Sequence, residues 1–443
     1  MPTAHTAALP PLETKLQNRT AKVAIIGLGY VGLPLAVEMA KAGLDVIGFE
    51  ISEKKVHSVN AGKSDIGDVD DATLAPFVKS GKVKATLDPK MLAQADCVAI
   101  CVPTPLSKTK DPDVSFIVAA VDTLKPHLHR DMLIVLESTT YPGTTEELIR
   151  PKLEETGLKA GIDFYLAFSP ERVDPGNAQF GTKNTPRIVG GTTAQCTRVA
   201  KSFYSIFLDN VVTVSSTQAA ETVKLLENTF RSVNIGLVNE VAQMCDRLNL
   251  DVWEIIDAAA TKPFGFMPFY PGPGLGGHCI PIDPHYWSWK LKSLNYYARF
   301  IELAGDINSR MPEYVVDRIA RVLNDDGKAL RGSEILILGV AYKRDISDMR
   351  ESPSLDVIRL LHLRGAKVAY ADPHVPSVRM EDGSVMDATP LSDGILAKAD
   401  CVAILTDHSD FDYNNICAKS HLVFDSRNAT KNVPKGVGRV WKL

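Results

Sequence analysis

A cysteine that follows a glycine-rich stretch is the residue of this chain best suited to covalent chemistry. Cys279 lies in the segment Tyr-Pro-Gly-Pro-Gly-Leu-Gly-Gly-His-Cys-Ile-Pro-Ile-Asp, which runs from Tyr270 to Asp283. A thiolate is a strong nucleophile, and glycines before it allow a bulky substrate to reach it. The segment therefore predicts a cysteine nucleophile whose surroundings activate it.

Two other interpretations of this segment stay open at this point. Metal binding would use His278, Cys279, Asp283 and His285, but no C-x-x-C or H-x-x-x-H pairing accompanies them, so we predict no metal. A cysteine can also simply fill a core, as Cys97, Cys101 and Cys401 are expected to do in apolar strands. Residue type alone does not choose between nucleophile and core.

A second chemical feature is the run Gly27-Leu28-Gly29-Tyr30-Val31-Gly32, which follows the apolar strand pattern VAIIG and opens a helical pattern. In this G-x-G-x-x-G turn the glycines permit the tight turn, the approach of a pyrophosphate and close helix packing. Glu50 ends the next predicted strand, where a carboxylate accepts hydrogen bonds from ribose hydroxyls and repels a 2′-phosphate. The pattern predicts binding of NAD rather than NADP.

The elements that position these residues follow an alternating pattern. From Lys22, short apolar runs alternate with helical patterns, which is typical of a parallel doubly wound sheet. From about 217 to 323 the periodicity is helical, and strands then return with SEILILGVAYK, where only Gly339 of a glycine turn remains. We predict an α/β protein with two Rossmann-like doubly wound domains joined by a central helical region, and no second dinucleotide site.

The predicted domains are a flexible N-terminal tail over 1–20, an NAD-binding domain over 21–216, a central helical linker and dimerisation domain over 217–325, and a C-terminal UDP-binding domain over 326–443. The last of these assignments rests on the family resemblance given below. The reaction is expected in the cleft between the two Rossmann-like domains.

Composition excludes several classes of protein. The chain has 443 residues, 45% of them hydrophobic, and a net charge of −4 without a block of lysine and arginine. This predicts a multidomain enzyme of small molecules that binds neither nucleic acid nor membranes. Seven cysteines without a disulfide pattern, and a start without a signal peptide, predict a cytoplasmic location.

Several motifs occur in an order that resembles one known family. They are GLGYVGLP, VPTP at 102–105, ESTTYPGT at 137–144, SPER at 169–172, ETVKLLENTFR at 221–231, GGHCIPID at 276–283 and YKRDISDMRESP at 342–353. From Lys22 to Arg427 the chain resembles the UDP-glucose/GDP-mannose dehydrogenase superfamily. Ordered motifs over this length are far more specific than a single glycine fingerprint.

The resemblance implies a two-step oxidation of the C6 alcohol of a UDP-sugar to a carboxylate, with NAD as acceptor. Cys279 matches the nucleophile that forms a thiohemiacetal and then a thioester. Lys224 and Asn228, one turn apart in a helical pattern, match the groups that stabilise the oxyanion. Asp283 matches an aspartate that positions water or Lys224, and the choice of base between it, Glu171 and Thr139 stays open.

The remaining contacts implied by the resemblance fall into two sets. Cofactor contacts are expected at Gly27, Gly29, Tyr30, Val31, Gly32, Glu50, Lys55, Thr104, Thr139 and Arg350. Substrate contacts are expected at Glu171, Arg172, Lys224, Asn228, Tyr270, Gly272, Gly274, Gly276 and Lys343. A homodimer or higher homo-oligomer is expected, as is a role in supplying uronates for polysaccharides.

One departure from the UDP-glucose branch bears on the substrate. Ile282 stands where UDP-glucose dehydrogenases usually carry a lysine, and GGHCIPIDPHYWSWK resembles the N-acetylhexosamine branch. We therefore favour UDP-GlcNAc, with UDP-glucose, UDP-GalNAc and UDP-ManNAc as alternatives. Only Lys262 lies near the position of an arginine that the family supplies across its dimer. A one-step alcohol dehydrogenase and a silent NAD-binding protein are the alternatives from other classes.

Overall fold

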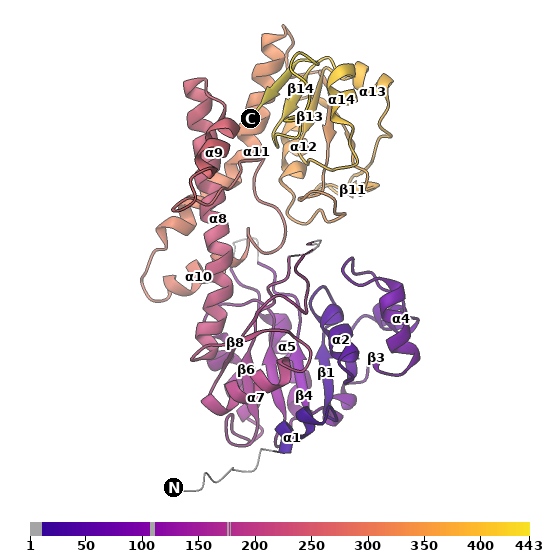
Figure 1. The fold of residues 1–443 in the computed structure, drawn as a ribbon, viewed down its shortest axis with the longest axis vertical. Coiled ribbons are helices and arrows are strands. Elements are labelled where there is room, and N and C mark those ends of the chain that lie inside the picture. The colour runs from indigo at the N-terminus through magenta and orange to yellow at the C-terminus, as the bar shows by residue number, and fades with distance from the viewer. Residues whose placement is uncertain (1–10, 107–110, 175–176, 178) are drawn as a thin grey trace. The chain divides into compact units, whose positions relative to one another are not determined.

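The computed structural model describes residues 11–106, 111–174, 177 and 179–443. The chain divides into two compact units (Figure 1). Unit one comprises residues 1–227 and 285–295, and unit two comprises residues 228–284 and 296–443. Each unit contains a twisted sheet of mainly parallel strands, which confirms the predicted α/β class with two Rossmann-like domains. The domain limits predicted from the sequence stay a prediction.

The sheet of unit one has eight strands in the order β3-β2-β1-β4-β5-β6-β7-β8, and only β6 and β7 pair antiparallel. The strands are β1 (Lys22–Ile26), β2 (Asp45–Phe49), β3 (Val83–Thr86), β4 (Cys97–Ile100), β5 (Leu133–Leu136), β6 (Tyr165–Phe168), β7 (Arg187–Gly191) and β8 (Val211–Thr213). The last three lie in the segments FYLAFSPE, PRIVGG and NVVTVSS. In a parallel sheet the carboxyl ends of the strands gather the loops that bind ligands.

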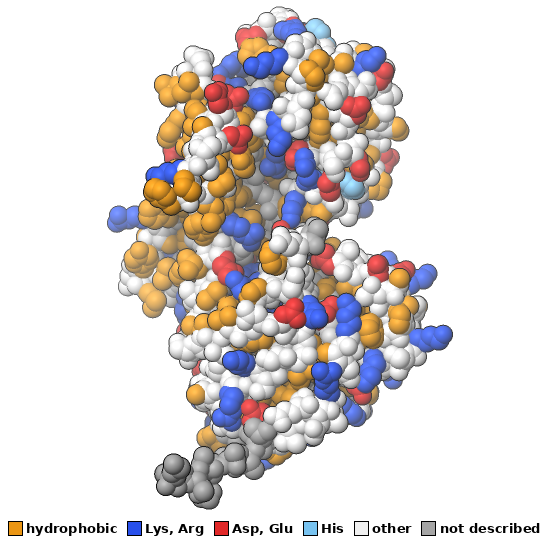
Figure 2. Space-filling view, in the orientation of Figure 1, with side chains coloured by type: hydrophobic (Ala, Val, Ile, Leu, Met, Phe, Trp, Pro, Cys, Tyr) orange, Lys and Arg blue, Asp and Glu red, His pale blue; other side chains and the backbone are white. Residues whose placement is uncertain are grey.

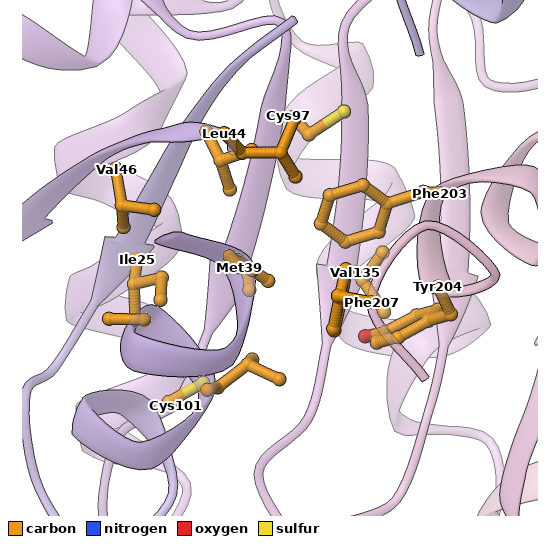
Figure 3. Packing of buried hydrophobic residues seen from close by; sticks show 14 of the residues in the cluster. Ile25, Met39, Leu44, Val46, Cys97, Cys101, Val135, Phe203, Tyr204 and Phe207 are labelled. Carbon is orange, nitrogen blue, oxygen red and sulfur yellow. The ribbon is translucent and has the colours of Figure 1, made fainter. Parts of the chain in front are cut away.

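Alternate residues of the strands belong to two hydrophobic cores, one on each face of the sheet. Val23 and Ile25 of β1 face one cluster, whereas Ala24 and Ile26 face the other. Figure 3 shows the first cluster, with Ile25 and Met39 on one side and Phe203, Tyr204 and Phe207 on the other. Because side chains alternate along a strand, the apolar run from Val23 to Ile26 of β1 has to be covered on both faces.

Helices cover both faces of this sheet. They are α2 (Gly32–Lys41), α3 (Glu53–Asn60), α4 (Asp71–Lys79), η1 (Pro89–Gln94), α5 (Ser115–Leu124), η2 (Lys125–His127), η3 (Thr145–Ile149), α6 (Arg150–Glu154) and α7 (Ala194–Tyr204). Three of these helices begin with a side-chain N-cap. The side chains of Ser52, Asp70 and Thr193 accept hydrogen bonds from backbone amides in the first turns of α3, α4 and α7.

The prediction of a flexible tail over 1–20 is wrong for part of that segment. Residues 11–17 form α1 (Pro11–Gln17), and Leu12 and Leu16 are buried in the core that α7 also lines. Glu13 pairs with Arg198 of α7 at 3.2 Å. Two leucines one turn apart give this short helix an apolar face, which the composition of the segment concealed. Residues 1–10 lie outside the described residues.

Unit two contains a parallel five-stranded sheet in the order β10-β9-β13-β14-β15 and a small antiparallel pair. The strands are β9 (Glu334–Leu338), β10 (Lys367–Ala371), β13 (Cys401–Ile404), β14 (Val423–Asp425) and β15 (Val440–Lys442), with β11 (Ser377–Arg379) and β12 (Val385–Asp387) forming the pair. The helices α12 (Pro353–Leu363), α13 (Asp393–Lys398) and α14 (Tyr413–Lys419) cover this sheet.

Long helices form the predicted central region. They are α8 (Thr217–Leu248), α9 (Val252–Ala260), α10 (Asp283–Lys292) and α11 (Arg299–Asp325). Within unit two α8 and α11 pack closely, since a Cβ added at Gly236 would lie 3.2 Å from the Cβ of Ala304. Asn308 bonds both Asn239 and the Ser232 carbonyl across this contact. Among the described residues no helix is long and apolar enough to cross a membrane.

Candidate active site

The glycine turn of unit one has the geometry that a dinucleotide needs. Gly27 follows β1 with φ +95°, and a Cβ there would lie 2.6 Å from the carbonyl oxygen of Cys101. A Cβ on Gly32, at the start of α2, would lie 1.9 Å from the Gly27 carbonyl oxygen. At Gly29 no atom lies within 4 Å of the Cβ position, so a phosphate can approach that backbone. The residues fit an NAD pyrophosphate at a helix N-terminus.

Glu50 is held at the end of β2 by backbone amides. Its carboxylate accepts hydrogen bonds from Leu28 at 3.1 Å, Ile51 at 2.9 Å and Ser52 at 3.1 Å. The acid therefore lies against the glycine turn, in the position predicted for a ribose contact. Lys55 lies in the first turn of α3, where its ammonium is 3.7 Å from Asp65. Tyr30 is exposed in the turn itself.

The corresponding turn of unit two is occupied by a carboxylate. Gly339 follows β9 with φ +84°, and the Asp372 carboxylate accepts hydrogen bonds from the amides of Val340 at 2.8 Å and Ala341 at 3.1 Å. A phosphate at this turn would meet the same amides and the negative charge of Asp372. This geometry agrees with the expectation that the second Rossmann-like domain takes something other than a dinucleotide.

The loops after β4 and β5 hold the two threonines predicted to contact the cofactor. Ser138 binds the backbone of Val102, with its hydroxyl accepting from the amide at 2.9 Å and donating to the carbonyl at 2.8 Å. Tyr286 donates to the carbonyl of Thr104 at 2.8 Å. Thr139 follows Ser138 and is half-buried. The two loops are thus tied together at the carboxyl edge of the sheet, beside the glycine turn.

Unit one also brings Lys224 and Glu171 together. Lys224 of α8 is 8% exposed, and its ammonium donates to the backbone carbonyl of Glu171 at 2.6 Å. The Glu171 carboxylate accepts from the amides of Arg172 at 2.7 Å and Val173 at 2.8 Å. Burial alone raises the pKa of Glu171, but the charge of Arg187, the Val173 amide and Lys224 outweigh it and lower the pKa. Arg172 pairs with Glu227.

Unit two holds the cysteine loop and its predicted partner residues. The Asp283 amide donates to the Cys279 carbonyl at 2.8 Å, so the aspartate lies one turn after the cysteine, where α10 begins. Asn228 donates to the buried Asp283 carboxylate and accepts from Arg231. Of the seven cysteines, all within the described residues, Cys279 alone is not buried. Core filling is therefore the weaker explanation for this thiol.

The glycine loop before Cys279 packs against later segments of unit two. Gly272 donates to the Asn239 side chain at 3.0 Å, and a Cβ there would lie 2.6 Å from the guanidinium of Arg427. A Cβ on Gly276 would lie 2.4 Å from that of Tyr342. The approach at Gly276 leaves no room for a side chain, whereas at Gly272 the flexible Arg427 side chain could move aside. Gly274, at φ +137°, has a backbone conformation that disfavours a side chain.

Two predicted contacts lie in the segment that packs on this loop. The carbonyl of Arg350 accepts from the Gly277 amide at 2.9 Å, and its guanidinium pairs with Asp348 at 2.7 Å. Lys343 follows Tyr342 and is half-buried. Tyr270, at the start of the loop, stacks on Trp253 and donates to Asp257 at 2.9 Å. Sequence reasoning missed Asn239 and Arg427, which stand outside the quoted motifs and have no local pattern. It also missed Arg231, which ends the motif ETVKLLENTFR but was given no role.

One group of side chains in the described residues has donor atoms close enough to hold a metal ion, and it lies outside the cysteine loop. Asp345, His374 and His408 place these atoms within 4.8 Å of one another. Both nitrogens of His408 are already engaged, Nδ1 accepting from the Asp345 amide at 2.9 Å and Nε2 lying 3.1 Å from Asp372. A metal would have to displace these bonds. The absence of a metal cofactor stays a prediction.

Together, the two Rossmann-like sheets, the glycine turn and the cysteine loop define a dinucleotide-dependent oxidoreductase class. Residues 21–208 match the NAD-binding domain of the UDP-glucose/GDP-mannose dehydrogenase family, 218–310 its central domain and 336–432 its UDP-binding domain. The chain belongs to this family, and it is an NAD-dependent dehydrogenase of a UDP-sugar. This confirms the resemblance and the cofactor predicted from the sequence.

Individual relatives cover nearly the whole chain. A UDP-N-acetyl-D-mannosamine dehydrogenase of Methanococcus maripaludis is 36% identical over 438 residues, covering 95% of this chain and 96% of its own. A UDP-N-acetyl-D-glucosamine 6-dehydrogenase of Salmonella typhi is 34% identical over 415 residues, covering 91% and 95%. The solved structure of a UDP-D-ManNAc dehydrogenase from Pyrococcus horikoshii has a TM-score of 0.86 at 33% identity, covering 95% and 98%.

Proposed function

We propose that this enzyme oxidises the C6 alcohol of a UDP-N-acetylhexosamine to the uronate through a covalent bond to Cys279. The observation that carries the proposal is the half-buried thiol one turn before Asp283, whose carboxylate binds Asn228. NAD⁺ held at the glycine turn would supply the hydride acceptor, and two NAD⁺ molecules would be consumed per sugar, one for each oxidation step. The names of the relatives support an N-acetylhexosamine as the sugar.

Each assigned catalytic residue has a separate chemical role in this proposal. The Cys279 thiolate adds to the C6 aldehyde left by the first oxidation, and the thiohemiacetal becomes a thioester in the second. Lys224 and Asn228 stabilise the negative charge that develops on the C6 oxygen. Water then attacks the thioester carbon, with Glu171 accepting its proton and Thr139 orienting it, and the carbon–sulfur bond breaks. The aldehyde stays on the protein throughout, so a reactive intermediate is not released.

The other assigned residues bind and orient the ligands in this proposal. The cofactor is contacted by Gly27, Gly29, Tyr30, Val31, Gly32, Glu50, Lys55, Thr104, Thr139 and Arg350. Arg172, Lys343, Tyr270 and the glycines at 272, 274 and 276 contact the UDP-sugar.

The expected result of a substrate panel tests this proposal. With UDP-GlcNAc, UDP-ManNAc, UDP-GalNAc and UDP-glucose offered separately, we expect an N-acetylhexosamine to yield two NADH per sugar consumed. UDP-GlcNAc is the sugar favoured by the sequence, and UDP-ManNAc is the one named for several relatives. NADH absorbance and quantification of the uronate give the ratio. One NADH per sugar, with aldehyde or ketone as product, would contradict the two-step mechanism.

We also propose that the enzyme is a homodimer joined through α8. Within unit two this helix exposes Phe230, Leu237, Met244 and Leu248, which recur at helical spacing along one stripe. Figure 2 shows many hydrophobic side chains over the helices of this unit. An exposed apolar stripe of this kind is typical of a surface that a partner covers.

A single charge in the stripe is expected to separate the subunits. Leu237→Glu places a carboxylate on each side of a two-fold interface, which costs several kcal/mol when the charge is desolvated. We expect light scattering to give the mass of a dimer for the native chain and of a monomer for this variant. Ile162→Glu, at an exposed apolar position of unit one, is the control and should leave the dimer intact. A native monomer would contradict the proposal.

A further inference from the structure

A buried arginine of unit one, itself outside the motifs quoted above, joins two carboxylates that belong to the motifs ESTTYPGT and SPER. Arg187, the first residue of β7, is 3% exposed. Its guanidinium lies 3.2 Å from the Glu171 carboxylate and 3.3 Å from the Glu137 carboxylate, and it donates to the Pro170 carbonyl at 2.9 Å. The arginine therefore ties the end of β5 to the loop after β6.

The far side of the guanidinium is also enclosed. Tyr204 of α7 donates to the Glu137 carboxylate at 2.5 Å, and its ring lies 5.4 Å beneath the guanidinium carbon. Tyr204 itself packs between Phe203 and Phe207, so its position is set by the core (Figure 3). Arg187 thus has little freedom to turn away from Glu171, because Tyr204 and Glu137 occupy the remaining space.

Both carboxylates contact the same guanidinium, but their environments shift their pKa values in opposite directions. Burial raises the pKa of Glu137 to about 7, whereas the pKa of Glu171 is lowered. The other groups that face Arg187 are Cys101 and Tyr204, and burial raises the pKa of both well above the usual values. The carboxylates of Glu171 and Glu137 are therefore the groups that pair with the charge of Arg187, and Glu171 has Lys224 as a second cation beside it.

We propose that Arg187 is a positioning residue for the hydrolytic half of the reaction, holding the Glu171 carboxylate ionised and oriented while Glu137 and Tyr204 hold the guanidinium. The inference rests on the proposed function, which assigns thioester hydrolysis to Glu171. In that step the carboxylate takes a proton from water, the water oxygen bonds to the thioester carbon, and the carbon–sulfur bond breaks to leave the Cys279 thiolate. Only the ionised carboxylate can accept this proton.

Removing Arg187 is therefore expected to change the pH dependence of one step. Without the adjacent positive charge the pKa of Glu171 rises, since an opposite charge at this distance lowers a carboxyl pKa by about 1–3 units. The acid limb of thioester hydrolysis then moves to higher pH by about one unit or more. The two oxidation steps, which do not use Glu171 as a base, keep their rates.

The competing explanation is that Arg187 has a purely structural role. The following variants distinguish that role from a positioning role. Arg187→Met alone leaves the buried Glu137 without a counter-charge and Glu171 with Lys224 as its one remaining cation, and it can prevent folding. The double variant Arg187→Met/Glu137→Gln removes one carboxylate together with the cation, so the buried charge that remains is Glu171 alone, beside Lys224. Arg187→Lys keeps the charge and loses the planar fork. Glu137→Gln alone keeps Arg187 on Glu171 and serves as the matched control.

The experiment follows the covalent adduct rather than overall turnover. Each protein is mixed with excess NAD⁺ and with UDP-GlcNAc or UDP-ManNAc, whichever supports turnover, at a series of pH values from acidic to neutral, and samples are quenched with acid at intervals. Intact mass reports the thioester on Cys279, and absorbance reports NADH. We expect the double variant to form NADH as fast as Glu137→Gln, but to retain the adduct up to a pH about one unit or more above that at which Glu137→Gln loses it, with Arg187→Lys between the two.

The outcomes are distinguishable. A folded double variant whose adduct decays with the pH profile of Glu137→Gln would show that Arg187 is only structural. If the double variant does not fold, the pH profile of adduct decay is compared between Arg187→Lys and the native chain. Identical profiles would then show that Arg187 is only structural. If the native chain forms no adduct on Cys279 at all, the proposed function fails, independently of any variant of Arg187.

Discussion

Replacing Cys279 with serine is expected to lower the rate of uronate formation by at least about 10³-fold, since removal of a covalent nucleophile can cost up to about 10⁶-fold in kcat. A serine hydroxyl is not ionised near neutral pH and no base is assigned to activate it here. The C6 alcohol can still be oxidised once, so we expect at most one NADH per active site before the reaction stops. Rapid mixing followed by absorbance measures that burst, and mass spectrometry measures the uronate.

A second cysteine provides the control for this variant. Cys245 of α8 is buried in the packing of α8 and α9 and has no assigned role, so Cys245→Ser should keep two NADH per sugar. Because Cys279 is only half-buried, its replacement should leave thermal unfolding close to that of the native chain. Uronate formation within tenfold of the native rate in Cys279→Ser would show that the thiol is not the nucleophile.

The second large effect is expected at Lys224. Its ammonium is 8% exposed and already oriented by the Glu171 carbonyl at 2.6 Å, so little reorganisation is needed when negative charge develops on the substrate. Lys224→Met keeps the length and apolar stem of the side chain and removes the charge. We expect kcat to fall by about 10²–10³-fold, the usual range for one oxyanion donor, with a much smaller change in KM.

The control for Lys224→Met is a lysine whose charge faces solvent. Lys398 of α13 is 73% exposed and pairs with Glu334, a surface pair that contributes up to about 1 kcal/mol to stability. Lys398→Met should therefore leave kcat unchanged. Steady-state NADH formation gives both parameters, and circular dichroism checks the fold. A loss of less than tenfold in kcat for Lys224→Met would exclude it as the main oxyanion donor.

The glycine-rich segments illustrate what a sequence shows well. Gly27 and Gly32 were predicted to serve a dinucleotide turn, and the structure gives Gly27 a positive φ and leaves no room for a Cβ at either residue. These requirements are local, because the backbone of one turn sets them. Lys224 and Asn228 were likewise placed one turn apart on a helix, which follows from the helical period alone.

Contacts between distant segments were not predictable in the same way. Arg187, Glu137 and Tyr204 come from β7, the loop after β5 and α7, and nothing in their local sequence links them. The one available signal was a charged residue at the start of an otherwise apolar strand. α1 was missed for a related reason, since its two leucines acquire a partner surface only when α7 is in place.

The sequence by itself thus determined the class of fold, the cofactor turn and the family, because periodicity, glycine turns and ordered motifs are properties of short stretches. Only the tertiary structure decided which side chains surround the reacting groups: Asn228 with Asp283, Lys224 with the Glu171 carbonyl, and Arg187 between Glu137 and Glu171. The physical reason is that strand order and register bring these residues together, and both depend on how entire faces of the sheet are buried rather than on any local pattern.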